Sequence, residues 1–263
     1  MHISTRVNSV FRLVLLIAVL GVSLCVPTFA HPQSTSIQET IEAQRQRLNS
    51  ADAEERRDAL MKLGSMRRPE ASSVAMAGLS DAAPMVRAVA AKAILAVGSE
   101  QSVPALLPLL NDKDDFVRRE AAYALGLTKS RAATSALTGL LVGDKEDGVR
   151  SAAAVALGEI GDEAAVISLA GVLAPEGKKR EKNGFVMRAA ARSLGQTRSR
   201  AGVPALVVAL GNEKLDGDIR REAAQALGLI GDPSAVSALR TAATSEDPYL
   251  AQAAVNSLKK LTP

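Results

Sequence analysis

Residues 147–162 read Asp-Gly-Val-Arg-Ser-Ala-Ala-Ala-Val-Ala-Leu-Gly-Glu-Ile-Gly-Asp, and versions of this stretch recur along the chain. Residues 117–127 (Val-Arg-Arg-Glu-Ala-Ala-Tyr-Ala-Leu-Gly-Leu) and residues 219–229 (Ile-Arg-Arg-Glu-Ala-Ala-Gln-Ala-Leu-Gly-Leu) are near copies of each other. The copies start at residues 55, 86, 117, 149, 186, 219 and 250, at intervals of 31 to 37 residues. A period of this length, repeated over most of a chain, is typical of a repeat array.

Each unit predicts two helices. The first runs from an acid at its N-cap through an Ala-rich stretch to Leu-Gly, and Gly161 and Gly231 are expected to end it in the left-handed conformation. Asp162 and Asp232 are expected to cap the second helix. The acids expected to cap the first helix are Asp115, Asp147 and Asp218.

The second helix carries a Leu column and a column of mostly Val three residues before it. This i, i+3, i+7 spacing places both columns on one buried face of a helix. The Leu column is Leu106, Leu137, Leu169, Leu206 and Leu239, and the other is Val103, Thr134, Val166, Val203 and Val236.

The composition fits closely stacked helices. The chain of 263 residues holds 47 Ala but only 4 Phe, 2 Tyr and no Trp, so its core is built from small and aliphatic side chains. Its one Cys and two His all lie within the first 31 residues. The remaining chain therefore cannot form a Cys/His metal site or use thiol or imidazole catalysis, and no cofactor is expected.

The first 30 residues predict a secretory signal peptide. Arg6 and Arg12 precede the apolar run 13–26, and the small residues Thr28 and Ala30 stand before a cleavage site. Cleavage would place the protein in a bacterial periplasm or outside the cell, whereas an uncleaved segment would anchor it to a membrane. Residues 31–36 are then expected to form a linker and 37–50 a lead-in helix, followed by the repeats over 51–263.

The recurring Asp-x-Val-Arg-x-x-Ala-Ala-x-Ala-Leu-Gly-x-Ile-Gly-Asp pattern resembles the HEAT repeat, in particular the short bacterial, phycobilisome-lyase-like type. The resemblance covers residues 51–263. It implies an all-α superhelix, a right-handed α-solenoid of about six and a half helix pairs in which each repeat contacts its neighbours. It also implies a scaffold that binds other proteins.

An Arg column marks the start of the first helices. It could form a stripe that tracks phosphates, or a structural ladder in which each Arg pairs with a cap Asp of its own or a neighbouring repeat. The ladder is the favoured interpretation, because Asp accompanies Arg in most repeats and cancels its field. The column is Arg56, Arg87, Arg118, Arg150 and Arg220, and is displaced to Arg188 in repeat five.

The turn between the two helices alternates in charge from repeat to repeat. Odd repeats carry cations and even repeats carry acids, which is expected to stabilise the edge of the stack, although a partner of matching charge could also use it. The cations are Arg67, Arg68, Lys129, Arg131, Arg198 and Arg200, and the acids are Glu100, Asp162, Glu163 and Asp232.

A partner-binding surface is expected on the second helices, at the positions one and five residues after the Val column. None of these residues is charged or aromatic, which argues against nucleic acid and favours close approach by a peptide or partner helix. A tightly curved, partly closed groove is the alternative. The ten positions are Pro104, Pro108, Ser135, Gly139, Ile167, Gly171, Pro204, Val208, Ser237 and Thr241.

The insertion 175–184 adds a second candidate contact. Its cations suit an acidic partner or anionic head groups, while a solvated loop is the simpler interpretation. Tyr123 is expected to be a packing variation or an exposed anchor beside Phe116. The cations of the insertion are Lys178, Lys179, Arg180 and Lys182.

These features together predict an exported, non-enzymatic scaffold that binds a protein or peptide. Two alternatives remain open: a bilin-lyase-like enzyme, and an adaptor attached to the membrane by the 178–182 loop or an uncleaved anchor.

Overall fold

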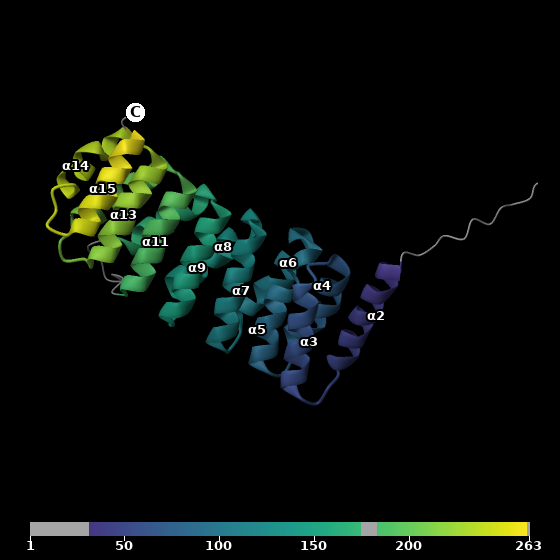
Figure 1. Ribbon diagram of the computed structural model, residues 1–263. Coiled ribbons are helices and arrows are strands. Elements are labelled where there is room, and N and C mark those ends of the chain that lie inside the picture. Colours follow the sequence, from purple (N-terminus) through teal and green to yellow (C-terminus); the bar gives the residue numbers. More distant parts are fainter. Residues whose placement is uncertain (1–31, 175–182, 262–263) are drawn as a thin grey trace, which may run out of the picture. The chain divides into compact units, whose positions relative to one another are not determined.

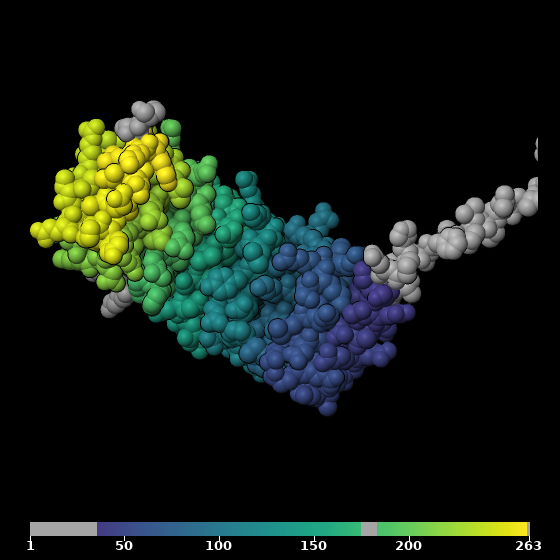
Figure 2. Space-filling view, viewed as in Figure 1, coloured from purple at the N-terminus to yellow at the C-terminus, as the bar shows by residue number. Residues whose placement is uncertain are grey.

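The structure, a computed structural model, describes residues 32–174 and 183–261, and every regular element among them is a helix. The repeats belong to one compact unit, Thr40–Pro263. Within it the first helices of successive repeats pack side by side in a row, and the second helices pack against them (Figure 1). In the space-filling view the repeats follow one another from purple to yellow (Figure 2). The predicted all-α superhelix is confirmed.

Seven first helices and six second helices make up the array in the described residues. The first helices are α3 (Ala53–Ser65), α5 (Pro84–Ala93), α7 (Asp115–Thr128), α9 (Asp147–Ile160), α11 (Gly184–Thr197), α13 (Gly217–Ile230) and α15 (Pro248–Leu261). The second helices are α4 (Pro69–Ala75), α6 (Ser99–Leu106), α8 (Thr134–Gly143), α10 (Val166–Val172), α12 (Val203–Gly211) and α14 (Val236–Ala242).

Short 3-10 helices join or extend these elements. Four of them lead into second helices: η4 (Arg131–Ala133), η5 (Glu163–Ala165), η6 (Arg200–Gly202) and η7 (Pro233–Ala235). Three others follow α-helices: η1 (Met76–Ser80), η2 (Leu95–Val97) and η3 (Leu107–Asn111). The array is preceded by α2 (Pro32–Arg47), so residues 32–36 are helical where a linker was expected.

The core runs between the two layers of helices. All five members of the Leu column have no exposed surface, and four members of the column before it are buried, because both lie on the side of the second helix that meets the first helices. The first helices contribute Val86, Val117, Val149, Val186 and Leu250 to the same interior.

A glycine near the end of most first helices lets neighbouring first helices touch. A Cβ added to Gly126 would lie 2.7 Å from the Cα of Ala156, and one added to Gly195 would lie 2.8 Å from the Cα of Ala226. Both distances are shorter than any normal contact, so only glycine allows the two backbones to approach this closely. The Ala-rich composition therefore serves helix-to-helix stacking.

The residue with positive φ in the turn after the first helix alternates between glycine and a cation. Gly161 and Gly231 adopt the left-handed conformation, as expected, with φ of 68° and 74°. In odd repeats a cation occupies the same place with positive φ. These cations are Arg67, Lys129 and Arg198.

The N-caps of the first helices differ from those expected. The capping residues are Asp114, Glu146 and Asp216, one or two positions before the acids that the sequence pattern favoured, and Asp114 accepts a hydrogen bond from the Val117 amide. More than one acid stands at the start of each of these helices, and the chain path decides which one caps. Asp162 and Asp232, expected to cap second helices, instead cap η5 and η7, the 3-10 helices that lead into α10 and α14, and each accepts from an amide two residues later.

Among residues 32–174 and 183–261, no helix combines the length and the apolar character that crossing a bilayer requires.

Candidate partner-binding surface

The ten positions on the second helices that were expected to face away from the core are all exposed to solvent. Ile167 is the most open of the large apolar residues, with 84% of its surface accessible, and Val208 is 46% accessible. The second helices thus present a row of small and apolar side chains along the array. Its members are Pro104, Pro108, Ser135, Gly139, Ile167, Gly171, Pro204, Val208, Ser237 and Thr241.

This row opens into a cleft between repeats two and three. The cleft has a volume of about 1110 Å³, and Pro104, Pro108 and Gly139 from the row line it. Leu107 and Leu140 add apolar surface beside them. An apolar concave surface of this kind can take the side chains of a peptide.

Local sequence explains the position of the cleft. Proline lacks an amide hydrogen and its ring crowds the preceding turn; Pro104 lies inside α6 and Pro108 lies in η3, the tighter helix that replaces α6 after Leu106. On the opposite wall a Cβ added to Gly139 or Gly143 would meet nothing within 4 Å, so α8 leaves space there.

One end of the cleft is polar. Arg118, Asp112 and Asp144 line it together with Lys145, whose side chain is 80% exposed. The first three residues are engaged with one another or with neighbouring backbone, whereas the Lys145 ammonium group makes an exposed contact with the Glu146 carboxylate at 3.8 Å.

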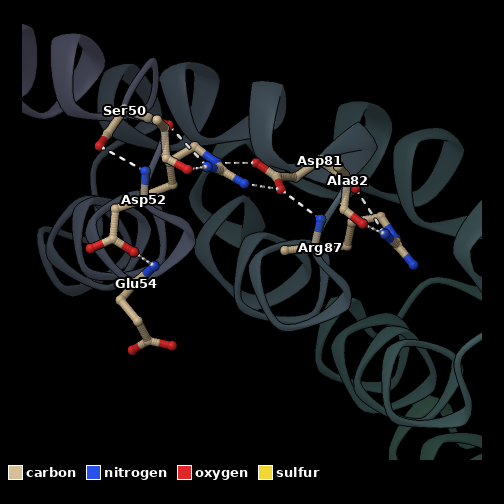
Figure 3. Close-up of polar contacts among 9 residues, drawn as sticks. Ser50, Asp52, Glu54, Asp81, Ala82 and Arg87 are labelled. Carbon is tan, nitrogen blue, oxygen red and sulfur yellow. Dashed lines mark hydrogen bonds and ion pairs between the residues drawn. The ribbon is translucent and has the colours of Figure 1, made fainter.

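At this end of the helices, arginines of the Arg column link neighbouring repeats through ion pairs to aspartates and hydrogen bonds to backbone carbonyls. This set of contacts is called the Arg–Asp relay. Arg87 donates to both carboxylate oxygens of Asp112 at 2.7 Å, and its Nη1 donates to the carbonyl oxygens of Asp81 and Ala82 at 2.8 and 3.1 Å. Arg56 binds the Asp81 carboxylate in the same two-pronged way. Figure 3 shows the Asp81 and Arg87 contacts. Each aspartate therefore receives one arginine on its carboxylate and the next on its backbone carbonyl.

The acids of this relay are not the N-caps of the first helices. Asp81, Asp112 and Asp144 lie before those caps, and each accepts from the amide two residues ahead, which fixes its carboxylate toward the arginine of the preceding repeat. Arg87 and Arg118 are only 8% and 7% exposed. These guanidinium groups are satisfied by protein and are not offered to phosphate.

The ion pairs of this relay lower the pKa values of the aspartates that take part in them. The hydrogen bonds from Arg56 lower the pKa of Asp81, and those from Arg87 lower the pKa of Asp112. For Asp144 burial acts to raise the pKa, but the hydrogen bond from Arg118 and the Glu146 amide outweigh it, and the pKa is lowered.

The relay changes after repeat three. Arg150 pairs with Asp147 of its own helix and donates to the Asp144 carbonyl oxygen. Arg220 has no carboxylate partner among the described residues, and its Nε donates to the Leu210 carbonyl oxygen at 3.0 Å. Arg220 therefore departs from the expected Arg–Asp pairing, whereas Arg150 keeps an aspartate of its own repeat as partner.

Repeat five also lacks the pattern, because the buried Met187 takes the ladder position. Arg188, next to it, reaches Asp218 at 3.3 Å, and both side chains are well exposed.

The charged turns contact one another across repeats. Arg200 lies 3.4 Å from Asp232, and the Thr134 and Ser199 hydroxyls donate to Asp162 and Glu163. These contacts link neighbouring turns along the edge of the stack.

Three aromatic rings share a position that the sequence pattern did not single out as a group. Phe116 lies under the Arg119 guanidinium at 4.8 Å, Phe185 under Arg188 at 5.4 Å, and Tyr249 under Arg221 at 5.6 Å. Each ring stands directly before the lead residue of its repeat, a column that was visible in the alignment of the copies. Tyr123, by contrast, lies within α7 and is 38% exposed.

Some candidates fall outside the described residues, namely the signal segment 1–30 and the cations Lys178, Lys179, Arg180 and Lys182. Within the described residues, no cluster of three or more acids, His or Cys is placed to hold a metal ion.

Stacked helix pairs with an open second-helix surface define the chain as an α-solenoid repeat protein. A family model described as HEAT repeats matches residues 41–126, 109–182 and 178–259. The chain belongs to the HEAT repeat family.

Individual relatives share parts of this architecture. The deoxyhypusine hydroxylase of Gallus gallus is 46% identical over 57 residues, which is 22% of this chain and 18% of that protein. Among solved structures, the complex of CpcE and CpcF of phycocyanin lyase from Nostoc sp. PCC7120 is similar with a TM-score of 0.52 and 26% identity, covering 85% of this chain and 88% of that one. The structure of human deoxyhypusine hydroxylase has a TM-score of 0.43 and 19% identity, and the match covers 87% of this chain and 98% of that one. The chain spans about a fifth of the length of its curated relative.

The sequence similarity to the Gallus gallus hydroxylase and the structural similarity to the lyase complex contradict the expectation that the protein is not an enzyme. The composition argument removed only thiol, imidazole and Cys/His metal chemistry. Carboxylates, lysines and hydroxyl groups remain available for acid–base work in this fold, so composition does not exclude catalysis as a class.

Proposed function

We propose that the chain binds a protein or peptide along the surface of its second helices. The observation that carries the proposal is the row of ten exposed, uncharged residues, three of which line the 1110 Å³ cleft. Contiguous exposed apolar surface on a protein typically marks an interaction site.

The mode of binding follows from the composition of the row. Pro, Gly, Ser and Val side chains lose little conformational freedom when covered, so affinity comes from many shallow contacts on a rigid support. The cleft would take the largest apolar side chain of the partner, and Lys145 at its polar end would meet a carboxylate. The Arg–Asp relay holds the repeats in register beneath this surface.

The similarity to one chain of the CpcE–CpcF complex supports this proposal, since that relative was solved with a second protein chain. Repeat arrays in general offer such extended surfaces.

A charge placed in the cleft tests the proposal. Gly139→Arg introduces a long cation where a Cβ has open space, so the fold should persist while the surface becomes obstructed. Gln225→Arg, on the exposed side of α13, adds the same charge away from the row. Proteins captured by the wild-type chain from an extract of the source organism should be lost with Gly139→Arg and kept with Gln225→Arg. Equal capture by both variants would contradict the proposal.

A second candidate is a part in a phycocyanin-lyase-type reaction, favoured by the 26% identity to a chain of that complex. Mixing the chain with phycocyanin and following the visible absorption spectrum tests it: a change that depends on this chain supports the candidate, and an unchanged spectrum removes it.

We also propose that the protein is exported and processed after Ala30, on the basis of the sequence of residues 1–30. An intact mass beginning at His31 would support this proposal, and retention of residues 1–30 would favour the anchored form. Sedimentation with anionic vesicles at low and high salt tests the 178–182 loop as a membrane contact.

A further inference from the structure

Repeat two departs from the others in its first helix. α5 spans 10 residues and then tightens into η2, whereas α7, α9, α11 and α13 each span 14. The position that holds glycine in the flanking repeats, Gly64 and Gly126, is Leu95 here. A leucine cannot make the close backbone contact that those glycines make, and α5 loses its last turn at this point.

A groove follows this departure, on the first-helix side of the array and separate from the second-helix surface. It has a volume of about 730 Å³, with α5 as its floor and α3 and α7 as its walls. Along α7 it extends from Phe116 to Leu127, which is about 16 Å of helix. Its floor and walls are mainly apolar, with Val89, Leu95 and Ala96 below and Met61, Phe116 and Leu127 beside them.

The charge within the groove is positive. Lys92 and Arg67 both line the groove, and both are exposed and without a carboxylate partner among the described residues. Glu120, the acid of the groove wall, is already paired with Arg119 at 3.4 Å. The two cations are therefore available to an anion that the groove brings near them.

The dimensions favour a thin apolar ligand. Neighbouring helix axes are about 8–10 Å apart, so α3 and α7 flank the floor at about 16–20 Å, and their own radii leave about 4–10 Å between them. A helix with side chains is about 10–12 Å wide and does not fit. An extended peptide would leave its amides unpaired, because helical walls offer no free backbone groups.

We propose that this groove binds an amphiphile with a single alkyl chain and an anionic head, either a carboxylate or a phosphate. The alkyl chain lies along α5 between Met61 and Leu127, and the head is held by Lys92 and Arg67. A pocket of this volume, mainly apolar with a few convergent polar groups, is typical of a small-molecule site.

Calorimetric titration of the full chain with laurate, dodecyl phosphate and dodecyltrimethylammonium, each below its micelle concentration, tests the proposal. We expect laurate or dodecyl phosphate to bind at least about tenfold more tightly than the cationic analogue, because only the anions match Lys92 and Arg67. The comparison of laurate with dodecyl phosphate distinguishes the two head groups.

Three variants and two controls locate the site. Lys92→Gln should weaken binding of the anions several-fold while Lys259→Gln, at an exposed lysine of α15, leaves it unchanged. Ala96→Phe from the floor and Ser65→Trp from the wall should each block the groove, so that binding is lost even if one of the two variants fails to fold. Gly139→Arg should not affect it, which separates this site from the second-helix surface.

Equal binding of anionic and cationic amphiphiles, or undiminished binding in the folded blocking variants, would overturn the proposal. Failure of every amphiphile to bind the folded wild-type chain would overturn it as well.

Discussion

The guanidinium group of Arg118 binds the carboxylate of Asp144 through two hydrogen bonds, Nε to Oδ2 at 2.7 Å and Nη2 to Oδ1 at 3.0 Å. The two side chains are 9% and 6% exposed. The same arginine donates through Nη1 to the Asp112 carbonyl oxygen at 2.9 Å. One side chain thus joins the loops that precede α7 and α9, and the repeats are fixed to one another by polar contacts as well as by the core.

The planar fork of arginine is required at this position. Arg87→Lys keeps the charge but cannot supply both bonds to Asp112 and those to the Asp81 and Ala82 carbonyl oxygens, so the free energy of unfolding should fall by about 2–3 kcal/mol. Urea denaturation followed by circular dichroism measures the loss.

Arg188→Lys is the matched control, because its pair with Asp218 is exposed and should be worth less than about 1 kcal/mol. Equal losses in the two variants would show that the relay contributes no more to the free energy of unfolding than an exposed ion pair does.

Acid should weaken the relay. The folded pKa values of Asp81, Asp112 and Asp144 are lowered, so the unfolded chain takes up protons first as pH falls. The stability from these pairs is present above about pH 3.9, the ordinary aspartate value, and is lost as pH falls through the lowered folded values.

Asp112→Asn should reduce the dependence of unfolding free energy on pH between about pH 5 and pH 2, measured by urea titrations across that range. Asp58→Asn, at an acid whose side chain is 52% exposed, should leave the profile as it is in the wild type. A wild-type profile in Asp112→Asn would argue against the relay as the acid-sensitive element.

Most of the fold and part of the binding surface could be predicted from the sequence. Residue spacing alone predicts the repeat period, the buried Leu106 column and the exposed row that contains Ile167. It does so because every repeat packs against its neighbours in the same way. The left-handed ends at Gly161 and Gly231 follow from local backbone chemistry.

Features that depend on contacts between repeats were not predictable in this way. Which of Asp112, Asp114 and Asp115 caps α7, and which pairs with Arg87, is decided by the path of the loop between repeats. The groove beside α5 is marked in the sequence by Leu95, which interrupts the glycine column. The depth of the groove, however, depends on how α3 and α7 are placed on either side of α5.

The glycine column can be tested by adding one methyl group. Gly126→Ala would place a Cβ 2.7 Å from the Cα of Ala156, so α7 and α9 must move apart, and stability should fall by about 1–3 kcal/mol despite the better helix propensity of alanine. Thermal and urea unfolding measure the change.

Gly139→Ala adds the same methyl group inside α8, where nothing lies within 4 Å, and should stabilise the protein by up to about 1 kcal/mol. Opposite signs for the two substitutions are expected, and a stabilising Gly126→Ala would mean that the first helices do not pack as closely as described.

Site-specific photo-crosslinking tests the binding proposal most directly. A photoreactive amino acid is placed at Pro108, at Gly139 or, as the control, at Gln225 on α13, and each chain is irradiated in an extract of the source organism. The second-helix proposal predicts one shared crosslinked partner from Pro108 and Gly139, absent at Gln225 and displaced by excess unlabelled wild-type chain. The same crosslinks from Gln225, or none from both cleft positions, would contradict it.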